Sequence, residues 1–158
     1  MQRASVEQQT IPKLHRVLIE REASAAPEFI DITADVLQAV ADSGVREGTV
    51  TVFSRHTTAA VKINENEPLL LEDMARFLDD AAPPEGEYRH NDFLVRTENM
   101  TEDECPNGHS HCQHLLLSAS ETIPVCDGSV LLGRWQRVFL IELDRPRRRE
   151  VVIQVVGW

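Results

Sequence analysis

The sequence has few cysteines, no long apolar run and no excess of positive charge, and each absence excludes a class of protein. The three cysteines, Cys105, Cys112 and Cys126, show no C-x-x-C spacing, so we expect no disulfide framework and a reducing, cytoplasmic setting. No stretch approaches the roughly 20 apolar residues that cross a bilayer, so we expect no membrane partner. The net charge of -10 argues against binding to the phosphates of a nucleic acid.

Several catalytic signatures are also missing. The sequence contains no G-x-S-x-G, no G-x-x-x-x-G-K-[ST] and no G-x-G-x-x-G. The simplest serine hydrolase, nucleotidase and dehydrogenase interpretations are therefore excluded. The first ten residues carry one arginine and no apolar core, so we expect a polar tail there and no signal peptide.

The pattern that remains predicts one α+β domain over residues 13–158, after a disordered tail over residues 1–12. Alternating or β-branched runs predict strands over 13–22, 49–53, 61–63, 122–126, 130–132, 138–143 and 151–156. Apolar residues at helical spacing predict helices over 31–43 and from 67 to about 80, and a short one over 111–118. The last of these helices is expected to carry Leu115 and Leu116 into the core. Asp127-Gly128, between two of these runs, predicts a β-hairpin. About seven mostly antiparallel strands and two or three helices result.

Histidine is the chemically informative residue type. Six occur, and four of them lie between His90 and His114 in a long polar stretch. Imidazole is a common metal ligand and is suited to proton transfer near pH 7. His109 and His111 would share one face of an extended segment, whereas His111 and His114 would share a face of a helix, and a solvated loop is the simpler alternative to both. Cys105 stands four positions before His109, but without a second close ligand pair it is expected to be an ordinary loop thiol.

Three other polar segments stand out. Ser54-Arg-His-Thr-Thr58 follows a strand, where it would either line a pocket or satisfy its own backbone in a turn. In Lys62-Ile-Asn-Glu-Asn66, Asn66 fits a helix N-cap, while Asn64 and Glu65 are harder to explain structurally, and the glutamate would suit a general base. Arg145-Pro-Arg-Arg-Arg149 is a basic cluster that fits a solvated turn or, more sharply, a phosphate or subunit contact.

Six short motifs in the same order together resemble the YjbQ family of secondary thiamine-phosphate synthases. The resemblance extends from about residue 13 to the end of the chain. Its motifs are His56-Thr-Thr-Ala-Ala60, Ile63-Asn-Glu-Asn66, Tyr88-Arg-His90, Asn107-Gly-His-Ser-His111, Ser120-Glu-Thr-Ile-Pro124 and Gly133-Arg-Trp-Gln136.

The resemblance implies a fold and an activity. The fold would be a β-sandwich of two sheets with helices inserted between strands, assembled as a homotrimer. The activity would be weak thiamine-phosphate synthesis, in which a hydroxymethylpyrimidine diphosphate joins a thiazole phosphate and pyrophosphate is released. The partner would then be a small phosphorylated molecule. A trimeric module that binds a phosphorylated metabolite or a metal ion without catalysis is the alternative.

The resemblance also implies which residues form the site. A divalent metal, with zinc as the first choice, would be bound by His90, His109 and His111. The same pocket would be faced by His56, Thr57, Thr58, Asn64, Glu65, Asn66 and Arg134, among which the two threonines and the arginine would donate to developing negative charge.

Overall fold

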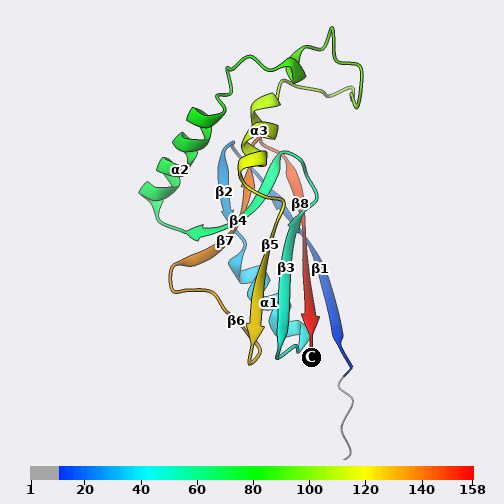
Figure 1. Ribbon diagram of the computed structural model, residues 1–158, viewed down its shortest axis with the longest axis vertical. Coiled ribbons are helices and arrows are strands. Elements are labelled where there is room, and N and C mark those ends of the chain that lie inside the picture. The colour runs from blue at the N-terminus through cyan, green and yellow to red at the C-terminus, as the bar shows by residue number, and fades with distance from the viewer. Residues whose placement is uncertain (1–10) are drawn as a thin grey trace, which may run out of the picture.

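The computed structural model describes residues 11–158, and Figure 1 shows its two sheets with helices at both ends. The predicted tail falls almost entirely on residues 1–10, which lie outside the described residues. The elements, in chain order, are β1 Lys13–Glu22, β2 Glu28–Asp31, α1 Thr33–Ser43, β3 Gly48–Ser54, β4 Ala59–Glu65, α2 Pro68–Ala81, the 3-10 helix η1 Arg89–Asn91, α3 Gly108–Leu116, β5 Ser120–Cys126, β6 Ser129–Val130, β7 Gln136–Glu142 and β8 Arg148–Gly157.

The strands form one five-stranded sheet, in the order β1-β8-β3-β5-β6, and one three-stranded sheet, in the order β2-β7-β4. Every strand pair is antiparallel. The predicted α+β class with two sheets is thereby confirmed. The strand that the sequence did not predict is β2, because its four residues are too short to show an alternating pattern.

The main core lies between the two sheets and against α1. Alternation along β8 buries Val151, Ile153 and Val155 and turns the residues between them outward. The inner face of the three-stranded sheet contributes Val138 and Leu140 to the same core. The apolar face of α1 closes it from the side, as Figure 1 shows behind β3 and β5.

A second, smaller core lies on the other face of the three-stranded sheet. The central strand β7 has Phe139 and Ile141 on this face, where Leu78 of α2 packs against them. Being covered on both faces explains why β7 reads as an unbroken apolar run. Helix α2 begins with Pro68 after Glu67, whose carboxylate accepts the Leu69 and Leu70 amide protons. Glu67 therefore caps this helix, and the N-cap alternative for Asn66 is wrong.

Helix α3 differs from its prediction in position and in orientation. It begins at Gly108, three residues before the predicted start, and it ends at Leu116. Leu115 is 85% exposed and Leu116 is 56% exposed, so the expectation that they enter the core is wrong. The opposite face is buried instead, since His109, Ser110 and Gln113 lie there. A short helix with mixed residues has no strong apolar face, and its packing is decided by its polar side chains.

The β5–β6 hairpin matches its prediction. Asp127 and Gly128 both have positive φ, of 50° and 76°, which is the backbone of a two-residue hairpin turn. Among the described residues, no helix has the length and apolar character to span a membrane.

Candidate active site

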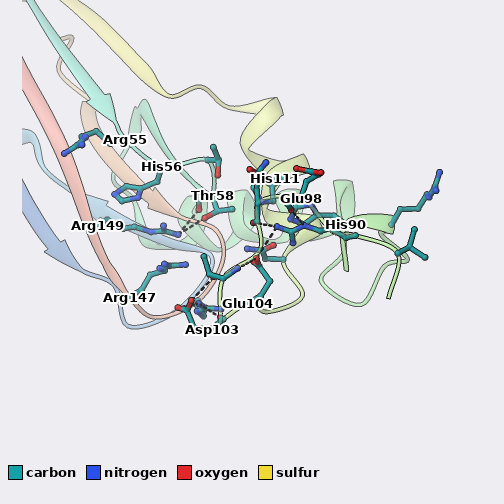
Figure 2. A pocket seen from close by; sticks show the side chains of 18 residues that line it. Arg55, His56, Thr58, His90, Glu98, Asp103, Glu104, His111, Arg147 and Arg149 are labelled. Carbon is teal, nitrogen blue, oxygen red and sulfur yellow. Dashed lines mark hydrogen bonds and ion pairs between the residues drawn. The ribbon is translucent and has the colours of Figure 1, made fainter. Parts of the chain in front are cut away.

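A cavity of about 1000 Å³ opens at the end of the sheets beside α3. Its walls come from the loop after β3, the connection from β7 to β8, the long segment that contains η1, and the start of α3 (Figures 1 and 2). The residues that line it include three carboxylates, Glu98, Asp103 and Glu104, and six arginines, Arg55, Arg89, Arg96, Arg145, Arg147 and Arg149. A chain with a strongly negative net charge therefore concentrates positive charge in this cavity.

Three imidazoles from distant parts of the sequence meet in this cavity. His56 comes from the loop after β3, His90 from η1 and His111 from α3. The His90 and His111 rings lie edge to face with centroids 4.6 Å apart. Figure 2 shows them on one side of the cavity and His56 on the other.

The close approach of His90 and His111 depends on Gly108. Its amide donates to Asn91 Oδ1 over 2.9 Å, which ties η1 to the start of α3. A Cβ atom at this position would lie 2.4 Å from Tyr88 Cβ, closer than packed atoms allow. Glycine at position 108 therefore lets the two segments pack, and with them the two imidazoles.

His56 is held by a backbone amide. Glu150 N donates to His56 Nε2 over 2.9 Å, which joins the loop after β3 to the start of β8. Partial burial lowers the pKa of His56, and the Arg149 and Arg147 guanidinium groups lower it further. The ring is therefore a neutral imidazole at neutral pH.

A buried ion pair between Arg149 and Glu142, which the sequence does not predict, lies beside His56 at the base of the cavity. Arg149 Nη2 donates to Glu142 Oε1 over 2.6 Å and to Thr58 Oγ1 over 2.9 Å. Glu142 Oε1 also accepts the Asp144 amide proton over 2.8 Å. Both side chains are almost completely buried. The basic cluster at 145–149 predicts a solvated turn or a phosphate or subunit contact, and neither includes a buried ion pair. The acidic residue Glu142 at the end of an otherwise apolar strand is the signal of a buried partner.

Other arginines of the cavity are held in place by less buried ion pairs. Arg147 Nη1 donates to Asp144 Oδ2 over 3.1 Å, and Arg96 Nη2 lies 3.2 Å from Glu104 Oε2. Arg89 makes no side-chain hydrogen bond or ion pair with any residue from 11 to 158. Guanidinium groups that keep unused N–H donors are suited to phosphate oxygens.

His111 is also biased toward its neutral form. Partial burial lowers its pKa, and the neighbouring His90 lowers it further, while Asp144 acts in the opposite direction. A neutral imidazole is able to accept a proton or to bind a metal ion.

The predicted set of three metal ligands is only partly assembled. His109 is buried outside the cavity, where its Nε2 lies 3.1 Å from Ser110 Oγ and its ring stands beside Tyr88. Helical geometry explains this, because neighbours two positions apart on a helix point in different directions. Within residues 11–158, the one set of three or more metal-type ligand atoms within 4.8 Å of one another is Glu47, Cys126 and Asp127, far from the imidazoles in the fold. The His90 and His111 rings are close neighbours in the cavity, whereas His109 lies outside it.

Four predicted site residues lie outside this cavity. Strand β4 begins directly after Thr58, and its seven residues span about 20 Å. The predicted residues Asn64, Glu65 and Asn66 therefore lie at the end of β4 that is far from the cavity. Asn66 Nδ2 donates to Asp31 Oδ2 over 3.0 Å there. Arg134 is exposed in the loop before β7 and stacks over Trp135. One chain therefore brings together only part of the predicted set, namely His56, Thr57, Thr58, His90 and His111.

Cys105 lies near the cavity and behaves as an ordinary thiol. It contacts Arg145, and its Sγ lies 3.7 Å from Asp144 Oδ1. Burial raises the pKa of this thiol, and Asp144 raises it further. All three cysteines are free.

Comparison with known proteins places this geometry in a family. The family described as UPF0047 protein YjbQ-like matches residues 18–158. A UPF0047 protein of Methanothermobacter thermautotrophicus is 42% identical over 130 residues, covering 82% of this chain and 83% of the relative. One of Synechocystis is 42% identical over 138 residues, covering 85% and 87%.

Solved structures agree with the sequence relatives. A YbjQ-like protein of unknown function from Sulfolobus solfataricus superposes with a TM-score of 0.84 at 31% identity, over 94% of this chain and all of that one. A hypothetical protein from Aeropyrum pernix gives 0.77 at 32% identity, over 92% and 99%.

Proposed function

Because the chain belongs to the UPF0047 family of YjbQ-like proteins, whose relatives leave the activity open, we propose from the cavity itself that it is an enzyme for a small phosphorylated substrate. The observation that carries this proposal is the set of six arginines facing His56, His90 and His111 in one cavity. Arginine is suited to phosphate oxygens, and neutral imidazoles are suited to proton transfer.

The reaction class that we favour releases a phosphate or diphosphate group. Such a step develops negative charge on the leaving oxygen, and fixed donors that face this charge lower the barrier. Arg147, Thr57 and Thr58 are in place to donate, and His111 is in place to accept a proton from the group that attacks. The buried pair of Arg149 and Glu142 holds the donors in position.

Within this class we propose the transfer that the family resemblance implies. A hydroxymethylpyrimidine diphosphate would join a thiazole phosphate, and pyrophosphate would leave. Two features support it: the volume of about 1000 Å³ is at the upper end for ligand sites, as two substrates require, and the arginines outnumber the carboxylates.

We further propose that the site binds a divalent metal ion, zinc by preference, through two protein ligands. His90 and His111 would bind it, and the substrate or water would supply the other ligands. Elemental analysis of untagged protein tests this point. Wild-type protein is expected to retain metal and His111→Ala to lose it, whereas His109→Ala is expected to retain it. Equal metal content in all three proteins would contradict the assignment.

We also propose that the chain forms a homotrimer. The outer face of the five-stranded sheet exposes Leu18, which pairs across to Val152 and from there to Phe53. A row of apolar side chains on an open sheet face is typical of a surface covered by another chain. The cytoplasmic location expected from the cysteine content stays a prediction.

The test of function is steady-state release of pyrophosphate from the proposed substrate pair. Wild-type protein is expected to turn over this pair, and Arg147→Ala is expected to lose at least 10-fold in kcat/KM because it lacks a charged hydrogen bond. A binding module without catalysis predicts instead that ligands raise the melting temperature while none is consumed. The incomplete metal set favours that second candidate, so turnover decides between them.

A further inference from the structure

The His56 ring is anchored on one side and open to the cavity on the other. Glu150 N is a donor only, so His56 Nε2 must accept with its lone pair. The proton of the neutral ring is then on Nδ1. This nitrogen makes no hydrogen bond with a residue of the described chain, and it is the ring nitrogen left to act in the cavity.

The two arginines near His56 favour the neutral state of its ring. The positive charges of Arg149 and Arg147 disfavour protonation of the ring, whereas the negative charges of Glu142 and Glu150 favour its protonation. The Glu142 carboxylate is already bound to Arg149, and the Glu150 carboxylate to Arg55. Burial acts in the same direction as the arginines.

The groups next to His56 are also donors. Thr58 Oγ1 accepts from Arg149 Nη2, so its own hydroxyl proton is free to be given to a ligand. Arg147 uses Nη1 on Asp144 and keeps other N–H groups. Figure 2 shows these side chains together at the His56 side. The carboxylates of the cavity come from the separate segment that includes Glu98, Asp103 and Glu104, where Asp103 pairs with Arg145.

We propose that His56, Thr58 and Arg147 together offer hydrogen-bond donors to one fully deprotonated oxyanion, such as a phosphate monoester dianion, and so form a subsite for it. In this subsite His56 gives its Nδ1 proton as a neutral donor and is neither a base nor a metal ligand. An oxyanion that still carries a proton has less negative charge to offer Arg147 and one acceptor oxygen fewer for these donors, so the subsite favours the dianion. The proposal rests on the proposed function for the phosphorylated ligand, but its proton arrangement is testable without turnover.

Long-range ¹H–¹⁵N NMR on the full chain, labelled at histidine, tests the proton arrangement. The His56 signal is assigned by its loss in His56→Gln. At pH 7.5 the expected ring carries a proton on Nδ1 and none on Nε2, and sulfate is expected to shift the Nδ1–H signal. A protonated Nε2, or a signal that sulfate leaves unchanged, overturns the proposal.

The pH dependence of binding tests the selectivity. Sulfate stays a dianion from pH 8 to pH 5, whereas a phosphate monoester with a second pKa near 6 loses about 90% of its dianion over this range. Measured by calorimetric titration, the affinity for methyl phosphate is therefore expected to fall about tenfold more than the affinity for sulfate between pH 8 and pH 5. Equal weakening of the two overturns the selectivity. If both tests agree with the proposal while no phosphorylated compound is turned over, the proposed enzyme function fails and the subsite stands.

Discussion

Arg149 and Glu142 form a buried ion pair beneath the cavity, in which Arg149 Nη2 donates to Glu142 Oε1 over 2.6 Å. The pair joins the start of β8 to the end of β7, and through the Thr58 hydroxyl it also reaches the loop that carries His56. One buried contact thus fixes three of the segments that form the site.

Removal of Glu142 should therefore destabilise the protein strongly. Glu142→Ala leaves a buried guanidinium without its counter-ion, which costs about 3–5 kcal/mol in the free energy of unfolding. Denaturant unfolding monitored by circular dichroism measures this loss. The matched control is Glu150→Ala, which removes the exposed pair with Arg55 and should cost at most about 1 kcal/mol. Equal losses for the two variants would contradict the assigned role.

The packing of η1 on α3 predicts a second effect. In Gly108→Ala the added methyl meets Tyr88, so the two segments must separate, at a cost of about 1–3 kcal/mol. Contact between His90 and His111 should be lost, and with it any metal that the pair binds. Gly133→Ala is the control, because the nearest atom to its added Cβ is the Gln136 side-chain oxygen at 3.3 Å. Thermal unfolding and metal content of both variants check the prediction, and an unaltered Gly108→Ala protein would refute it.

The lowered histidine pKa values predict how stability depends on pH. In the folded chain the pKa values of His56, His111 and His114 lie below the ordinary value of 6.5. Below that value the unfolded chain binds more protons, so stability is complete above about pH 6.5 and is lost as the pH falls through the folded pKa values. Urea unfolding at pH 8, 7, 6 and 5 in the presence of a chelator measures the trend. His56→Gln should flatten it, and a flat wild-type profile would contradict these shifts.

The open face of the five-stranded sheet predicts the assembly. Wild-type protein should have three times the chain mass of 17.8 kDa by light scattering after gel filtration. Leu18→Asp places a charge in the middle of the apolar row and should give the monomer. Leu94→Asp is the control, since Leu94 is 95% exposed in the segment after η1. A monomeric wild type, or a trimer that tolerates Leu18→Asp, would rule out this face as the interface.

The sequence was informative where a local pattern determines the structure. Alternation along residues 13–22 predicts β1, and the Asp127–Gly128 pair predicts the β5–β6 hairpin. Both features depend only on residues that are neighbours in the sequence. The expectation that His56, His90 and His111 share one site comes from the family resemblance and not from their spacing, and all three line the cavity.

The sequence was uninformative where distant contacts decide. Alternation along β8 places Arg149 on the buried face and Arg148 on the exposed one, but nothing local identifies Glu142 as the partner that neutralises the buried arginine. Likewise, the Asn64–Asn66 motif looked like part of the same site as Thr58, and only the extended geometry of β4 separates them. Long-range pairing, and not residue type, determines these positions.

The central claim is that this cavity binds phosphorylated compounds through its arginines, and Arg147 and Arg148 allow a matched test. Arg147 lines the cavity, whereas its neighbour Arg148 lies outside it. Calorimetric titration with pyrophosphate should show binding by wild-type protein and by Arg148→Ala. Arg147→Ala should bind about 10- to 100-fold more weakly, since it loses a charged hydrogen bond worth about 1.5–3 kcal/mol. Equal affinity in Arg147→Ala and Arg148→Ala, or no binding by wild type, would contradict the account.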